Sequence, residues 1–135
     1  MGIYTDDIDL IFMAIGIFWT LLFLQSGMDK VFDWKGNIDW LKGHFEKSIL
    51  GGIVQPMVAT LAFTEIVAGL ICAIGTVQVV LSGSTYWLAI GMIISIIALL
   101  MLFFGQRLAK DYEGARTIAV YFGVALISCL LLIKF

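Results

Sequence analysis

The chain has 135 residues, of which 61% are hydrophobic and only 13% are charged, and its formal net charge is −2. Soluble domains are about 45–50% apolar and about 25% charged, and a small domain cannot bury this much apolar surface. The composition therefore excludes a soluble globule and a disordered chain. It also offers no net positive charge for binding nucleic acid. We expect an integral membrane protein that forms one domain over residues 1–135.

Four stretches are long and apolar enough to cross a bilayer, which needs about 20 apolar residues in a helix. The predicted spans cover residues 8–28, 57–81, 86–105 and 115–133. These runs are continuous and do not alternate, which excludes the strands of a β-barrel. The sequence therefore predicts an all-α fold, an integral membrane four-helix bundle whose most extensive partner is the lipid bilayer.

The segment between the first two spans has the pattern of an amphipathic helix over residues 34–50. Apolar residues recur there every three or four positions, with charged residues between them, at Trp34, Ile38, Leu41, Phe45 and Ile49. Beside a membrane span, such a helix is expected to lie in the interface. It serves either as a lipid anchor or as a lid or docking surface for a partner.

The basic residues are sorted to one side of the predicted bundle. Seven of the eight Lys and Arg residues fall in loops 29–56 and 106–116, and the other is Lys134. Because positive charge marks cytoplasmic loops, both loops are predicted to face the cytoplasm and both termini the outside. We expect a bacterial cytoplasmic (inner) membrane.

Glu65 is the one carboxyl group that lies deep inside a predicted span, about nine residues from its start. Such a group is costly in lipid and usually faces the interior of the bundle. With no cation beside it, burial disfavours the charged form, so the sequence predicts a neutral side chain. Counting depth from the same membrane side gives Thr20, Ser95 and Tyr121 as its expected hydrogen-bond partners. The carboxyl is either a packing contact or a proton, ion or ligand site.

A second polar cluster lies where the spans leave the bilayer on the cytoplasmic side. It includes Gln25 and Lys30 after the first span and Arg107 after the third. These side chains either reach for the interface and pair within the loops, or bind an anion or headgroup above Glu65. Together with Glu65 and Tyr121, they are the candidate ligand-binding residues.

Small residues at spacings of four mark faces where membrane helices pack closely. On this basis we expect close packing at Gly16, Gly69, Gly91, Ala119 and Gly123.

The chain contains few residues that could bind a metal ion or carry out redox chemistry. The single histidine, His44, lies in the interfacial segment, and Cys72 and Cys129 lie in separate spans without a C-x-x-C pair. We therefore expect no metal site and no intrinsic cofactor.

Two stretches resemble the DoxX-like family of small membrane proteins. Residues 16–32, GIFWTLLFLQSGMDKVF, are similar to that family's first helix, which carries G-x-x-K followed by an apolar pair. Residues 65–75, EIVAGLICAIG, are similar to its second helix, which carries a Glu with a Gly four residues on. The resemblance implies a four-helix membrane bundle with Lys30 and Glu65 as the positions of interest. It also implies a link to quinone, since one member type is the membrane subunit of a thiosulfate:quinone oxidoreductase.

Three functions remain open. The first is a subunit or accessory of a larger membrane complex, with other membrane proteins as partners. The second is the membrane subunit of a quinone-linked oxidoreductase of the thiosulfate:quinone type. The third is a small transporter or lipid-handling protein that uses Glu65 as a proton site.

Overall fold

The computed structural model describes residues 5–44 and 52–134, and these ranges contain five helices and no strand. The helices are α1 (Thr5–Phe32), α2 (Trp34–His44), α3 (Val54–Ser82), α4 (Tyr86–Leu108) and α5 (Tyr112–Lys134). The predicted all-α bundle is confirmed, and each predicted span lies within one of the long helices. The helices extend beyond the spans because a charged residue can continue a helix once it has left the hydrocarbon. The predicted interfacial helix is helical over its described part, Trp34–His44, and the remainder of the prediction, residues 45–50, lies outside the described residues.

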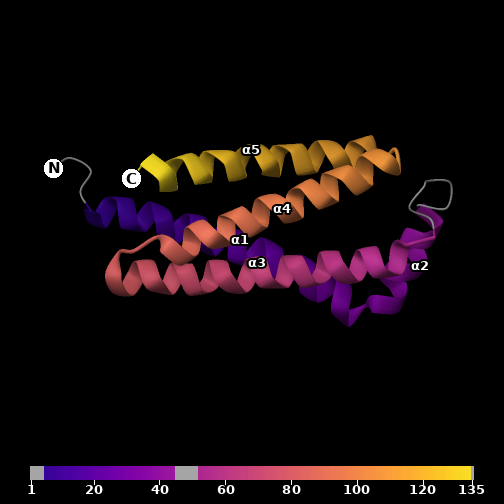
Figure 1. The fold of residues 1–135 in the computed structure, drawn as a ribbon, viewed down its shortest axis with the longest axis horizontal. Coiled ribbons are helices and arrows are strands. Elements are labelled where there is room, and N and C mark those ends of the chain that lie inside the picture. The colour runs from indigo at the N-terminus through magenta and orange to yellow at the C-terminus, as the bar shows by residue number, and fades with distance from the viewer. Residues whose placement is uncertain (1–4, 45–51, 135) are drawn as a thin grey trace.

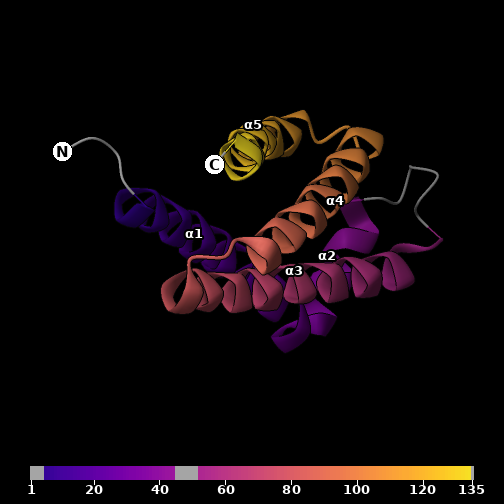
Figure 2. The ribbon, with the colours of Figure 1, turned by 60° about the vertical axis from the view of Figure 1, so that its left-hand side comes forward.

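The four long helices pack in chain order (Figure 1). α1 packs mainly against α3, α3 also packs against α4, and α5 packs mainly against α4. Figure 2 shows α4 crossing between α3 on one side and α5 on the other. The start of α1 and the end of α5 lie at the same end of the bundle, as an even number of spans requires.

The turns between the helices follow from local residue chemistry. Gly83 ends α3 in the left-handed conformation, with φ +73°, and its N–H donates to the carbonyl oxygen of Val79 over 2.9 Å. Such a conformation favours glycine because it has no Cβ. The side chain of Asp111 accepts a hydrogen bond from the N–H of Gly114 over 3.1 Å and so caps the start of α5. These turns make α4 an antiparallel neighbour of α3 and of α5.

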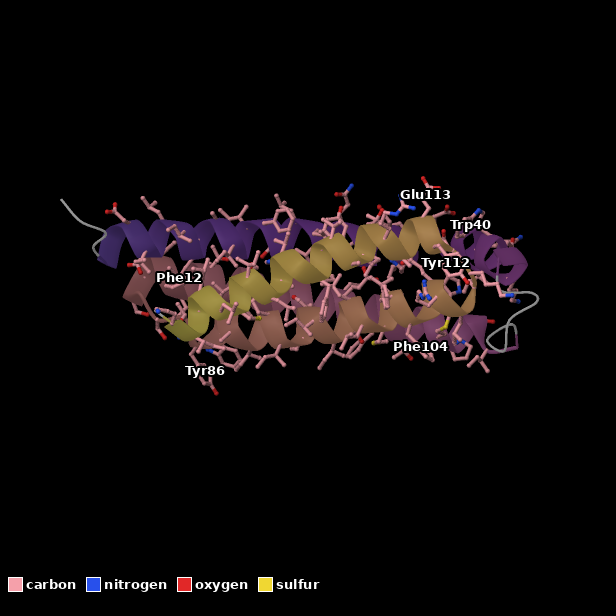
Figure 3. All side chains as sticks on the ribbon, turned by 90° about the horizontal axis from the view of Figure 1, so that it is seen from above. Phe12, Trp40, Tyr86, Phe104, Tyr112 and Glu113 are labelled. Atoms are coloured by element: carbon pink, nitrogen blue, oxygen red, sulfur yellow. The ribbon has the colours of Figure 1, made fainter. Side chains whose placement is uncertain are left out.

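The exterior of the bundle is apolar along its length. All four long helices are long and apolar enough to cross a membrane. Large apolar side chains are exposed on each of them, including Leu21, Phe63, Phe104 and Leu130. Figure 3 shows labelled aromatic residues near both ends, with Tyr86 at one end and Trp40 and Tyr112 at the other. Aromatic side chains at two levels match the two interfaces of a bilayer. The chain is therefore a small integral membrane protein.

The interior holds a compact core in the middle of the bundle. Trp19 and Phe23 of α1 are fully buried, and their rings stack with centroids 5.7 Å apart. They pack with Cys72 of α3, Met92 of α4 and Ala125 of α5. A second, smaller cluster joins Ile38 of α2 to Val58 of α3. This contact folds α2 back against the first turns of α3.

Candidate functional site

Glu65 lies eleven residues after the first residue of α3, about 16 Å along the helix axis. Its side chain is 0% exposed. This burial agrees with the sequence argument that the carboxyl faces other helices and not lipid. The residue that it meets differs from those expected.

Lys30, in the last turn of α1, forms an ion pair with Glu65. The distance from Lys30 Nζ to Glu65 Oε1 is 3.0 Å, and the lysine side chain is 15% exposed. The contact is electrostatic, since neither carboxylate oxygen has a partner of hydrogen-bond geometry among the described residues. The lysine ammonium also donates to Ser26, to its Oγ over 2.9 Å and to its carbonyl oxygen over 3.3 Å. The premise behind a neutral Glu65, that no cation lies beside it, is therefore wrong.

The three hydrogen-bond partners expected for Glu65 lie elsewhere. Ser95 donates to the carbonyl oxygen of Gly91 over 2.8 Å and lies 3.8 Å from the sulfur of Cys72. Thr20 Oγ1 is buried without a hydrogen-bond partner among the described residues. Tyr121 is half-buried against the core. None of the three donates to Glu65.

The depth count failed because the ends of the helices are not level. Gly27 lies against Ala62 and Ile66, and Gly16 lies against Thr76. The end of α1 therefore lies beside residues near position 60, and α3 begins more than a turn beyond it. Counting inward from ends assumed to be level therefore places the expected partner on α1 at Thr20, almost two turns from the level of Glu65. It is this stagger that brings Lys30 to the depth of Glu65.

A cavity of about 120 Å³ lies between α1, α3 and α4 at the ion pair. Its lining includes Lys30, Val58, Leu61, Met101, Leu102 and Gln106. Lys30 and Gln106 are the only polar residues among the lining residues, and the other lining side chains are apolar. The site therefore combines an apolar wall with an ammonium on one side and an amide on the other.

Gln106 was not recognised as a candidate from the sequence. Its amide oxygen Oε1 is buried and has no hydrogen-bond partner among the described residues. The sequence feature that could have identified it is the position of this polar residue immediately after a charge-free span. The helix of that span continues to Leu108 and so includes Gln106. A glutamine there was assigned to the loop because the span was ended at residue 105.

Two further predicted ligand residues, Gln25 and Arg107, do not line this cavity, and neither does Tyr121. Gln25 is exposed on α1. Arg107 is exposed, and its guanidinium carbon lies 4.7 Å from the centroid of the Tyr112 ring. This cation–π contact fixes the arginine at the bundle end. The ligand-binding role predicted for these two residues is therefore not supported by their positions.

The small residues divide into two groups. Gly16 packs against Thr76, Gly69 against Leu24, and Gly91 against Cys72. In contrast, Ala119 is exposed and no atom lies within 4 Å of the Cβ position of Gly123. The prediction of close packing at Ala119 and Gly123 is therefore wrong within this chain, because α5 turns that face away from α4.

A neutral polar layer crosses the middle of the bundle, and we call Trp19, Cys72, Ser95 and Ser128 the serine layer. Trp19 Nε1 donates to Ser128 Oγ over 3.3 Å, and Ser128 donates to the carbonyl oxygen of Val124 over 2.9 Å. Since the Ser95 hydroxyl donates to Gly91, the Cys72 thiol is the donor toward Ser95 Oγ. Each polar group of this layer has a partner, which is typical of a packing contact.

The described residues contain no group of three or more His, Cys, Asp or Glu side chains that could hold a metal ion. The side chain of His44 lies outside the described set. Comparison of the chain with protein-family models, with curated proteins and with solved structures gave no significant match. The site must therefore be interpreted from its own geometry.

Proposed function

We propose that the chain is a DoxX-like membrane subunit of a larger complex, and that its Lys30–Glu65 site receives a lipid-soluble ligand of the quinone class. The observation that carries this proposal is the ion pair itself. The two positions that match the DoxX-like motifs come from different helices and meet 3.0 Å apart inside the bundle. A cavity opens beside the lysine.

The geometry favours a ligand that is mostly apolar and carries no net charge. The positive charge of Lys30 and the negative charge of Glu65 compensate each other, so the pair leaves no charge for an ionic ligand to neutralise. An intramembrane ion pair is costly to retain if it serves packing alone, because apolar residues of similar volume are often as stabilising. Intramembrane charges mark functional sites for this reason.

Binding of a short-chain benzoquinone tests this assignment. The protein is placed in lipid nanodiscs, and quenching of Trp34, which packs beside Val58 at the cavity, reports binding. The Lys30→Met/Glu65→Leu double variant should bind about tenfold more weakly, equivalent to about 1.4 kcal/mol. Glu113→Gln, a change at an exposed acid, should bind as the native protein does. Equal quenching in all three proteins would reject the site.

The subunit role is supported by the outward face of α5. Ala119 and Gly123 offer a close-approach surface that none of the other described helices uses. Small residues of this kind allow a second membrane helix to approach. Mass spectrometry after mild purification should then find a partner that Gly123→Leu releases. Val77→Leu, at an exposed position of α3, should retain it. Retention by both variants would argue against this face as the contact.

A transporter role has less support. Transporter sites at the bilayer midplane are typically built from broken helices, whereas α3 is one continuous helix from Val54 to Ser82. The ion pair also has only one carboxyl group, so no relay of acids leads away from it among the described residues. Proton uptake coupled to solute movement in proteoliposomes would reverse this ranking.

We further propose that the α4–α5 turn and α2 face the bacterial cytoplasm. The distribution of Lys and Arg supports this orientation. Ser84→Cys in the α3–α4 turn should react with an impermeant maleimide from outside intact cells. Lys110→Cys in the α4–α5 turn should react only after permeabilisation. The reverse pattern would invert the orientation.

A further inference from the structure

We infer that the ligand of the cavity carries a hydroxyl group whose hydrogen is donated to Gln106 Oε1. This inference rests on the proposed function, because it requires that the cavity beside the ion pair binds a small apolar molecule. It adds the chemical class of the ligand's polar end, a neutral hydrogen-bond donor such as a phenol or an alcohol. Within the quinone class, it predicts that the hydroquinone, through one of its two hydroxyls, binds more tightly than the quinone.

The lysine ammonium is already surrounded by protein acceptors, two of them reached by hydrogen bonds and one by the ion pair. Its ammonium carries three hydrogens, and its nitrogen lies within 3.3 Å of three acceptors, Ser26 Oγ, the Ser26 carbonyl oxygen and Glu65 Oε1. A ligand that only accepts hydrogen bonds, such as a quinone carbonyl, would have to compete with the Glu65 carboxylate for the ammonium. Lys30 therefore lines the cavity but does not need an acceptor group from the ligand.

The unmet polar groups of the site are all acceptors. Among the described residues, Gln106 Oε1 and Glu65 Oε2 are both buried without a hydrogen-bond partner. Buried carbonyl and carboxylate oxygens are normally satisfied, and leaving one without a donor costs about 1–3 kcal/mol. A donor that enters the cavity would reach Gln106 first, since Gln106 lines it and Glu65 is not among the lining residues.

The orientation of the Gln106 amide is fixed by its neighbours. Its nitrogen Nε2 and the carboxylate oxygen Oδ2 of Asp111 both crowd the space where a Cβ at Gly114 would stand. An amide N–H beside a carboxylate is the favourable assignment, and the reverse would place two acceptors together. The nitrogen therefore faces Asp111, and the oxygen is directed away from it.

The cavity volume limits the rest of the ligand. An apolar protein cavity of about 150 Å³ holds benzene, and this cavity measures about 120 Å³. It therefore has room for about one small ring or a short branched chain. Apart from Lys30 and Gln106, its lining residues are apolar, so the part of the ligand inside the cavity must be apolar apart from this hydroxyl. A ring with one hydroxyl meets both conditions.

The experiment compares two probes of nearly equal volume, 4-fluorophenol and 4-fluorotoluene. Each is titrated into the protein in lipid nanodiscs and followed by fluorine NMR, with empty nanodiscs to subtract partition into lipid. The native protein should bind the phenol about tenfold more tightly than the toluene, the difference expected for one hydrogen bond to a buried acceptor. Gln106→Met, which keeps the side-chain length and removes the acceptor, should abolish that preference while still binding the toluene.

A matched control and a second variant keep the outcome clear. Gln55→Leu changes an exposed glutamine near the same end of the bundle and should leave the tenfold preference intact. Gln106→Leu repeats the removal of the acceptor in case the methionine variant does not fold. Equal binding of both probes by the native protein overturns the inference and leaves the proposed apolar-ligand site standing. Binding of neither probe above empty nanodiscs overturns the proposed ligand function itself.

Discussion

The bundle contains two polar regions that differ in charge and in packing. In the serine layer, Trp19, Ser95 and Ser128 form neutral hydrogen bonds among fully packed side chains. At the other region, Lys30 and Glu65 carry full charges, and a cavity lies alongside. Among the described residues, three buried oxygens there, two of Glu65 and one of Gln106, have no hydrogen-bond partner. A membrane protein gains little by placing charge in its interior for packing alone. The contrast indicates that the serine layer holds the helices together and that the ion pair has another task.

The largest expected effect comes from breaking the ion pair on one side. Glu65→Ala removes the carboxylate and leaves the Lys30 ammonium beside an apolar wall. Loss of one partner of a buried pair typically costs about 3–5 kcal/mol. The lower end is expected, because Lys30 is already 15% exposed and can reach toward the interface. Reversible unfolding in mixed detergent and SDS micelles measures the change, with Glu113→Ala as the control at an exposed position. A loss below about 1 kcal/mol would place the pair on a level with a surface contact.

Replacing both partners separates stability from function. In Lys30→Met/Glu65→Leu, no charge remains buried, so the free energy of unfolding should return to within about 1 kcal/mol of the native value or exceed it. Ligand binding should still be weakened about tenfold, equivalent to about 1.4 kcal/mol. A double variant as unstable as Glu65→Ala would mean that the pair serves the fold, and the contrast between the two regions would disappear.

The sequence predicted the architecture well because one free-energy cost, that of placing charge in hydrocarbon, dominates the arrangement of spans and loops. The cost of charge in hydrocarbon separates spans from loops, and this cost placed Glu65 in the interior before any contact was known. The pairing with Lys30 could not be obtained in the same way. It depends on how far α3 extends past α1, and that stagger is set by the packing of Gly27 against Ala62 and Ile66. Gln106 was missed for a related reason, since only the structure shows that α4 keeps it inside the bundle.

The packing within the serine layer gives the next effect in size. A Cβ at Gly91 would stand 2.7 Å from the sulfur of Cys72 and 3.0 Å from its backbone nitrogen. Gly91→Ala must therefore push α3 and α4 apart, and overpacking of this kind costs about 1–3 kcal/mol. Gly123→Ala is the matched control, because its Cβ meets no atom within 4 Å, and its effect should stay within about 0.5 kcal/mol. Unfolding in SDS compares the two, and equal losses would show that α3 and α4 are not closely packed in the membrane.

The smallest effect is expected from the hydrogen bond between Trp19 and Ser128. Ser128→Ala removes the acceptor of Trp19 Nε1, a contact of 3.3 Å, and also the bond from Ser128 to the Val124 carbonyl. Hydrogen bonds between membrane helices average about 0.6 kcal/mol, so a loss of about that size is expected. Thr60→Val is the control, because Thr60 is exposed and its hydroxyl makes the same kind of bond, to the carbonyl oxygen of Pro56 four positions back. The difference between the two variants isolates the interhelical contact. If that difference approached the cost of Glu65→Ala, neutral and charged contacts would be equally important to the fold. The charge at Lys30 and Glu65 would then need no functional explanation.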